Sequence, residues 1–257
     1  MQPTKPDGSA YDCTFSDDFD GNQLDTSKWL PVRSLNTGFI TGLGYGSPDC
    51  YFDRPENISV RDGSLHLTSR VEGQMFDCRA NYGTFPTNES AGSVVTYGKF
   101  AQAFGRFEVR AKFPANATTD YISALWLSPE VPVYGAWPNS GEVDIAEWFG
   151  DGWGTNPVFP SVHYAGEDPA KSTGRTCAVP GAGTSFHTYA VEWTENTMSF
   201  YYDDELCFEH AWTPKSGFTG SQPFDQPFNI VLTQTGGFMR PVGTVVDLEV
   251  DWVRAWK

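Results

Sequence analysis

Positive charge is scarce in this chain of 257 residues, in which 17 lysines and arginines stand against 32 aspartates and glutamates. The net charge is −15 and the isoelectric point lies near 4.5. Nucleic acids and anionic membranes attract basic surfaces, so this balance argues against both as partners. The sequence also has no apolar stretch long enough to cross a bilayer as a helix. We therefore expect neither a nucleic-acid partner nor a membrane partner.

Helical periodicity is also missing, since no run of ten or more residues shows a clean apolar stripe. The 26 glycines and 18 prolines divide the chain into short segments, many of which alternate apolar and polar residues. The clearest strand signals are residues 106–113, a hairpin over 57–68 around Asp62-Gly63, a meander over 189–208 and a final strand over 248–252. Many short strands with such punctuation predict an all-β sandwich or barrel.

An export signal is absent from the N-terminal residues, which are polar. We expect residues 1–14 to be a polar leader and residues 15–257 to form a single domain, a length that suits one all-β unit. The five cysteines include no Cys-x-x-Cys pair, which argues against zinc-binding and thioredoxin-like sites. Export would favour disulfides. The expected pairs are Cys50–Cys78 and Cys177–Cys207, with Cys13 unpaired, although the sequence alone leaves other pairings open.

The most informative segment is residues 141–148, which read Gly-Glu-Val-Asp-Ile-Ala-Glu-Trp. Successive side chains of a strand point to opposite faces, so Glu142 and Asp144 share one face. Glu147 lies five positions after Glu142 and would point to the other face of a regular strand. One extra residue, a β-bulge between Asp144 and Glu147, would bring all three carboxyl groups to the same face.

Three carboxyl groups on one face suit the cleavage of a glycosidic bond. A retaining glycosidase needs two carboxyl groups roughly 5–5.5 Å apart, one as nucleophile and one as proton donor. The α-carbons of Glu142 and Glu147 would lie about 13 Å apart along the strand, a gap that two long side chains can close on a concave sheet. An acid between them would raise the pKa of its neighbours. A solvated acidic strand face and a hard-cation site remain alternatives.

Residues 141–147 resemble the signature of glycoside hydrolase family 16 in its longer form, Glu-x-Asp-x-x-Glu, which resembles laminarinases more than lichenases. Further segments resemble the family in the same order along the chain. They are Phe15–Phe19, Leu24–Trp29, Phe104–Lys112, Ala124–Leu127, Phe186–Trp193 and Val250–Arg254. The resemblance implies a β-jelly-roll sandwich of two antiparallel sheets, the concave one forming a substrate cleft. We expect a secreted, monomeric enzyme whose partner is a polysaccharide.

By position in the matched motif, Glu142 is implied to be the nucleophile and Glu147 the acid/base, with Asp144 hydrogen-bonded to Glu142 and tuning both. The implied reaction is endo-acting, retaining cleavage of β-1,3-glucan by double displacement, without a catalytic cofactor. The same machinery directed at mixed-linkage glucan, a β-galactan or an agar-type polymer is the nearest alternative. A non-catalytic β-glucan-binding protein is a more distant one, because such proteins usually lack the glutamate pair that this chain has.

Three of the nine tryptophans are candidates for binding sugar rings. Trp126 resembles a cleft tryptophan of the family. Trp137 lies in a loop rich in proline and glycine, where a core position is hard to explain, so we expect it to stack on the substrate. Trp148 directly follows Glu147, and strand parity turns it away from that glutamate unless the chain twists there. Trp148 is therefore a candidate for the cleft, with the core as the alternative.

Four polar residues complete the expected substrate site. Asn57 and Arg106 resemble family positions that hydrogen-bond to sugar hydroxyls, and a surface ion pair is the alternative for Arg106. His163 matches a histidine near the acid/base residue of laminarinase-like members, with a structural role as its alternative. Gln234 lies where many laminarinases carry Asn-Leu-Ala-Val-Gly-Gly. This chain departs from that pattern, which leaves its fine specificity open.

Many members of the family hold a calcium ion on the convex side of the sandwich, away from the chemistry. The corresponding positions here are Asp18, the backbone of Gly63 and Asp251. Calcium takes six to eight oxygen ligands, and these residues supply only a few. The resemblance thus makes calcium a candidate structural ion, with plain solvent beside Asp251 as the alternative.

Overall fold

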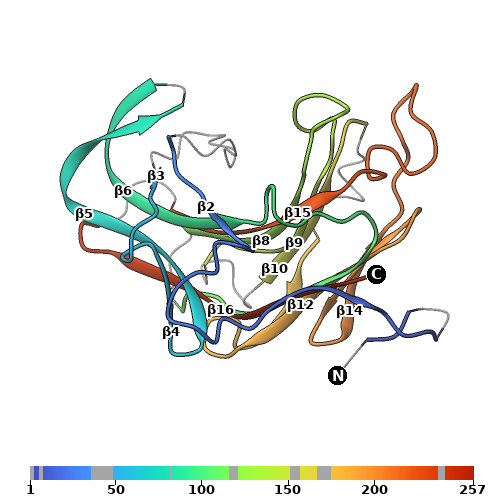
Figure 1. The fold of residues 1–257 in the computed structure, drawn as a ribbon, viewed down its shortest axis with the longest axis horizontal. Coiled ribbons are helices and arrows are strands. Elements are labelled where there is room, and N and C mark those ends of the chain that lie inside the picture. The colour runs from blue at the N-terminus through green and yellow to red at the C-terminus, as the bar shows by residue number, and fades with distance from the viewer. Residues whose placement is uncertain are drawn as a thin grey trace.

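Two β-sheets, joined by one pair of long strands, make up the protein (Figure 1). The computed structural model describes residues 3–5, 8–35, 49–81, 83–115, 121–150, 157–166, 175–236 and 241–257. Within these residues it contains sixteen strands and no α-helix. The described part of the chain accordingly offers no helix that is able to cross a membrane.

We call the sheet that carries the acidic segment the inner sheet. Its strands are, in order, β11 (Cys177–Ala178), β10 (Pro157–His163), β9 (Glu142–Trp148), β8 (Tyr121–Pro129), β15 (Phe228–Gly236) and β6 (Gly83–Val95). Two short strands, β2 (Leu30–Pro31) and β3 (Cys50–Tyr51), pair with β6, and β3 does so in parallel. The other strand pairs of this sheet are antiparallel.

The outer sheet consists, in order, of β5 (Ser64–Ala80), β16 (Val245–Trp256), β7 (Gly105–Lys112), β12 (His187–Trp193), β13 (Met198–Tyr202) and β14 (Glu205–His210). The strand β1 (Cys13–Asp17) pairs with β16, and β4 (Ile58–Arg61) pairs with β5. All of these pairings are antiparallel. The expected jelly-roll sandwich is confirmed.

The core lies between the two sheets and follows from the alternation of each strand. Phe107 and Val109 of β7 point into it from the outer sheet and are each 1% exposed, while Val143 and Ile145 of β9 point into it from the inner sheet and are fully buried. The hydroxyl of Tyr202 crosses this layer and donates to the carbonyl oxygen of Ile145 at 3.0 Å. The two sheets are therefore held together by apolar packing and by a hydrogen bond to the backbone of β9.

The opposite face of the inner sheet, which we call the open face, carries a second, smaller apolar cluster. Its buried members are Val32, Tyr51, Ala91, Val95, Ala124, Trp126 and Val231. Leu125 and Leu127 of β8 belong to the core, so Ala124 and Trp126 must point to the other side. In Figure 1 the inner sheet curves upward at both ends, with the β5–β6 hairpin at one end.

The strand β6 belongs to both sheets, which it joins by pairing with β5. β6 pairs with β15 over Gly92–Val95 and with β5 over residues 83–90. Gly92 lies where the pairing changes, and a Cβ added there would come within 2.1 Å of the backbone oxygen of Asn57. This approach of two backbones requires glycine, because any side chain would force them apart.

The strands predicted from alternation are found. Asp62 and Gly63 turn β4 into β5 with φ of +53° and +77°, and the predicted meander is β12 to β14. The expected disulfides Cys50–Cys78 and Cys177–Cys207 are present, and Cys13 is an exposed free thiol. β1 begins at Cys13, two residues before the expected start of the domain.

Candidate active site

β9 presents its acidic residues on the open face through the predicted bulge. Leu125 of β8 pairs with Ala146, whereas the next residue, Trp126, pairs with Asp144, so Ile145 is the extra residue. The register with β10 shifts at the same place. Ile145 and Ala146 are both fully buried in the core. The bulge between Asp144 and Glu147 is therefore confirmed.

His163 of β10 joins two of the acids. Its Nε2 lies 3.1 Å from Oδ2 of Asp144, which is only 4% exposed. One polar atom each of Glu142, Asp144 and His163 lie within 4.8 Å of one another, and His163 is the register partner of Glu142. The ring of Trp137 lies 5.9 Å from that of His163 and is 57% exposed. The structure thus brings four of the predicted site residues together.

Glu147 has a pKa well above the ordinary value for a glutamate. Burial of its carboxyl group is the largest cause, and the negative charges of Asp144 and Glu142 raise the pKa further, against a smaller opposing effect of His163. A carboxyl group with a raised pKa keeps its proton at pH values where others have lost it. Such a group can protonate a leaving oxygen, as a general acid must.

Trp126 lies beside the acids on the same face of the inner sheet. Its pairing partner is Asp144, and its indole Nε1 donates to Oγ1 of Thr233 at 3.1 Å. Thr233 in turn contacts the hydroxyl of Ser93 at 3.0 Å. Thr233 and Ser93 were not among the predicted site residues, although the alternation of Thr233 with the core residue Leu232 is a signal for the open face. Sugar stacking by Trp126 and Trp137 stays a prediction that fits these positions.

Two of the predicted substrate residues, Trp148 and Asn57, are core or framework residues. Trp148 is fully buried and stacks on Phe113, with ring centroids 5.8 Å apart and planes at 7°. The parity of the bulged strand turns it into the core, so its assignment to the cleft is wrong. Asn57 is also fully buried, and its amide donates to the Thr68 carbonyl and the Ser90 hydroxyl. The amide nitrogen therefore bonds within the protein, so the assignment of Asn57 to sugar binding is wrong as well.

Arg106 and Gln234 point away from the open face. Arg106 lies on the outer side of β7, opposite the core residue Phe107, and forms ion pairs with Glu108 at 2.7 Å and Glu192 at 3.4 Å. An ion pair, the alternative for Arg106, is thus what the structure shows, although the arginine is buried rather than at the surface. Gln234 is fully buried and accepts a hydrogen bond from Ser123, which lies on the same face of β8 as the core residue Leu125. Neither side chain can reach a sugar on the other side of the inner sheet.

The residues expected to hold calcium have cationic partners. Asp18 accepts a hydrogen bond from Arg254 at 2.8 Å, and Asp251 is ion-paired with Arg110. Gly63 lies in the β4–β5 turn. In the described ranges, neither aspartate belongs to a group of three side chains suited to a metal. A guanidinium already neutralises each carboxylate, so these residues fit a calcium ion poorly.

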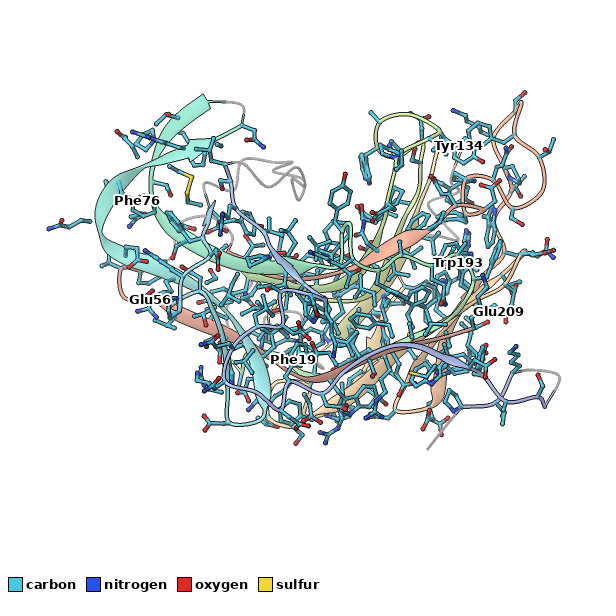
Figure 2. The ribbon with its side chains drawn as sticks, in the orientation of Figure 1. Phe19, Glu56, Phe76, Tyr134, Trp193 and Glu209 are labelled. Carbon is cyan, nitrogen blue, oxygen red and sulfur yellow. A yellow bond between two sulfur atoms is a disulfide. The ribbon has the colours of Figure 1, made fainter. Side chains whose placement is uncertain are left out.

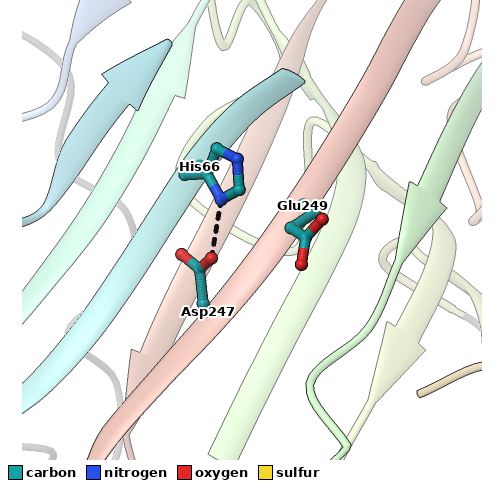
Figure 3. Close-up of side chains that lie close together, drawn as sticks. All are labelled: His66, Asp247 and Glu249. Carbon is teal, nitrogen blue, oxygen red and sulfur yellow. Dashed lines mark hydrogen bonds and ion pairs between the residues drawn. The ribbon is translucent and has the colours of Figure 1, made fainter. Parts of the chain in front are cut away.

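A different cluster on the outer sheet combines His66, Asp247 and Glu249 (Figure 3). Nδ1 of His66 lies 2.6 Å from Oδ2 of Asp247. Arg61 contacts both His66 and Asp247, at 3.2 and 3.3 Å, and Lys112 is ion-paired with Glu249. In this cluster Arg61 and Lys112 neutralise the carboxylates that a metal ion would otherwise bind.

Comparison with known proteins identifies the family. A family model described as "Beta-porphyranase A-D, GH16 domain" matches residues 11–257. The Beta-glucanase of Rhodothermus marinus is 30% identical, over 96% of this chain and 85% of that protein. The Keratan-sulfate endo-1,4-beta-galactosidase of Sphingobacterium multivorum is 32% identical, over 96% of this chain and 55% of that protein. The chain spans only 39% of another relative, the Glucan endo-1,3-beta-glucosidase A1 of Niallia circulans, at 28% identity.

Comparison of the fold with solved structures leads to the same family. The X-ray structure of the laminarinase from Rhodothermus marinus has a TM-score of 0.79 at 29% identity, covering 96% of this chain and 97% of that one. The family hydrolyses glycosidic bonds with retention of configuration and without a catalytic cofactor. Because the family model covers nearly the whole chain and the bulged strand supplies the carboxyl groups that such chemistry needs, the chain belongs to glycoside hydrolase family 16.

Proposed function

We propose that this protein is an endo-acting, retaining β-1,3-glucanase. The observation that carries the proposal is the bulge of β9, which places Glu142, Asp144 and Glu147 on one face of the inner sheet. The likeness to a laminarinase over nearly the full length of both chains supports the substrate class.

The proposed reaction takes two steps. The carboxylate of Glu142 attacks the anomeric carbon, and a bond from that carbon to Glu142 forms as the bond to the leaving oxygen breaks. Glu147 donates its proton to that oxygen. Glu147, now ionised, then takes a proton from water as the water oxygen displaces Glu142. Burial and the charge of Asp144 support the first step because they keep the pKa of Glu147 high.

A galactan is the second candidate substrate. The matched family model is described as that of β-porphyranases, and one relative is named as a β-galactosidase. The sequence of β15 also departs from the laminarinase pattern around Gln234, next to Thr233 on the open face. These observations concern the sugar that is held and leave the roles of Glu142 and Glu147 unchanged.

Release of reducing sugar from linear β-1,3-glucan, mixed-linkage glucan, β-galactan and agarose tests the proposal. We expect release from the β-1,3-glucan, which should fall to background in the Glu142→Gln variant. Release from a galactan alone would keep the mechanism and overturn the substrate. Release from none of the four, with binding retained, would overturn the enzymatic function in favour of glycan recognition.

Trp137, exposed beside His163, would stack on a sugar ring next to the cleaved bond. The two disulfides support an exported protein, because disulfides persist in oxidising compartments. We also propose that the catalytic domain is a monomer.

For Asp18 and Asp251 we propose a role in ion pairs with arginine rather than in calcium binding. A ligand that binds only the native state raises the Tm. We therefore expect the Tm of the chelated protein to stay the same when calcium is added. A rise of several degrees would show that calcium displaces the arginines and that the ion-pair proposal is wrong.

A further inference from the structure

The β5–β6 hairpin carries a pocket that the proposed catalytic site does not use. It is lined by Phe52 and Arg54, which follow β3, and by residues 72–76 of β5. Its volume of about 440 Å³ lies within the range of roughly 300–1,000 Å³ that is typical of small-molecule sites. No lining residue belongs to the strands that carry the acids. Figure 2 shows Phe76 on the hairpin, at the opposite end of the molecule from Tyr134.

Part of this pocket is apolar and open to solvent. The rings of Phe52 and Phe76 have centroids 5.7 Å apart with planes at 52°, and Met75 is 63% exposed. The guanidinium of Arg54 lies 4.6 Å from the centre of the Phe52 ring. Burying partly exposed aromatic rings such as these against an apolar ligand surface removes them from water and stabilises binding. The C–H face of a pyranose ring provides such a face.

The remaining part of the pocket is polar without being charged overall. Arg54 and Glu72 are ion-paired, with side chains 35% and 29% exposed. The hydroxyl of Ser90 accepts from Arg54 and donates to Glu72, both at 3.0 Å. Hydrogen-bond donors and acceptors therefore lie side by side, as vicinal sugar hydroxyls require. The carboxylate of Glu72 and the net charge of −15 both disfavour an anionic ligand.

We propose that this pocket is a second glycan-binding site, which holds a distant stretch of the same neutral polysaccharide chain that the catalytic site cleaves; this inference rests on the proposed function. In the strand order, β9 is separated from β5 by β8, β15 and β6. Four strand spacings correspond to about 19 Å across the sheet. An oligosaccharide shorter than this distance of about 19 Å cannot contact both sites. A long chain held at one site, by contrast, is present at high effective concentration at the other.

The test compares the double variant Met75→Ser/Phe76→Ala with a matched control, Leu206→Ser. Leu206 lies on β14, is 58% exposed and does not line the pocket. Each change is made in the Glu142→Gln background, and retention is measured on insoluble β-1,3-glucan and on agarose. We expect the double variant to bind the β-1,3-glucan at least about ten-fold more weakly than the control, because linking two sites can raise the affinity by about 10²- to 10⁴-fold.

The same changes in the active enzyme separate the pocket from the catalytic site. We expect the loss of kcat/KM on the polymer to exceed the loss on a short β-1,3-linked oligosaccharide by about ten-fold. Equal losses on both substrates, or equal retention of the double variant and the control, would overturn the second site. Retention on agarose alone, with a difference between the two variants, would support the pocket and overturn the proposed β-1,3-glucan substrate.

Discussion

Replacing Glu142 with glutamine is expected to lower kcat by at least about 10⁴-fold, because the neutral amide cannot form the covalent bond to the sugar. The fold should survive, since Glu142 is only partly buried and the core side of β9 is unchanged. Initial rates of sugar release and a thermal unfolding curve check the two parts. Glu195→Gln, in the exposed turn after β12, is the matched control and should keep full activity. Activity of Glu142→Gln within ten-fold of the parent would refute the nucleophile assignment.

Glu147→Gln should behave differently from Glu142→Gln. Loss of a general acid costs about 10²- to 10⁴-fold on a polysaccharide, and the loss should be smaller for an aryl glycoside whose leaving group departs without a proton. The raised pKa of Glu147 also predicts that the activity of the parent falls as the pH rises through that pKa. This fall should be absent from the aryl glycoside profile of Glu147→Gln.

The raised pKa of Glu147 has a consequence for stability with a definite sign. The folded protein binds the proton of Glu147 more tightly than the unfolded chain does, so ionising this group above its ordinary pKa of about 4.3 destabilises the fold. Glu147→Gln should therefore have a higher Tm than the parent at neutral pH. The difference should vanish at pH values below that ordinary pKa. An equal Tm at neutral pH would contradict the raised pKa.

Gly92→Ala is expected to destabilise the protein by about 3 kcal/mol, the upper end of the range typical of overpacking. The added Cβ would lie 2.1 Å from the Asn57 oxygen, and that oxygen also accepts a hydrogen bond from the Thr68 amide at 2.9 Å. Moving the Asn57 carbonyl away would weaken this bond as well.

Urea unfolding measures the effect of Gly92→Ala. Gly73→Ala is the matched control in the neighbouring strand, because no atom lies within 4 Å of a Cβ added there. We expect the control to stay within about 1 kcal/mol of the parent, as exposed substitutions usually do. Equal midpoints for the two variants would mean that β6 and the backbone of Asn57 move apart without cost.

The alternation of residues along a single strand predicted which side chains share a face of that strand. The spacing of the acids in residues 141–148 requires a bulge for a common face, and the bulge is present. The same parity turns Trp148 inward, so its burial was available from the sequence. A second bulge went unnoticed: the register of β16 against β7 shifts between Val250 and Trp252. The shift moves Val253 into the core and leaves Trp252 partly exposed.

Patterns within one strand could not say which sheet a strand joins. Arg106 lies on the polar face of an alternating strand, as predicted, but β7 belongs to the outer sheet, where the polar face is the far side of the molecule. Thr233, Gln234 and Thr235 are all polar, so composition does not show which of them faces the sugar. Pairing with β8 settles the question, because Gln234 lies opposite the inward-facing Ser123.

The place of β16 in the outer sheet sets an order for folding during synthesis. β16 pairs with β5, β7 and β1, so it fills the middle of the sheet. Its residues 245–256 leave the ribosome after every other strand described. Until they emerge, β5 and β7 keep unpaired edges that invite intermolecular pairing. We therefore expect the emerging chain to be prone to association with its own copies until translation passes this strand.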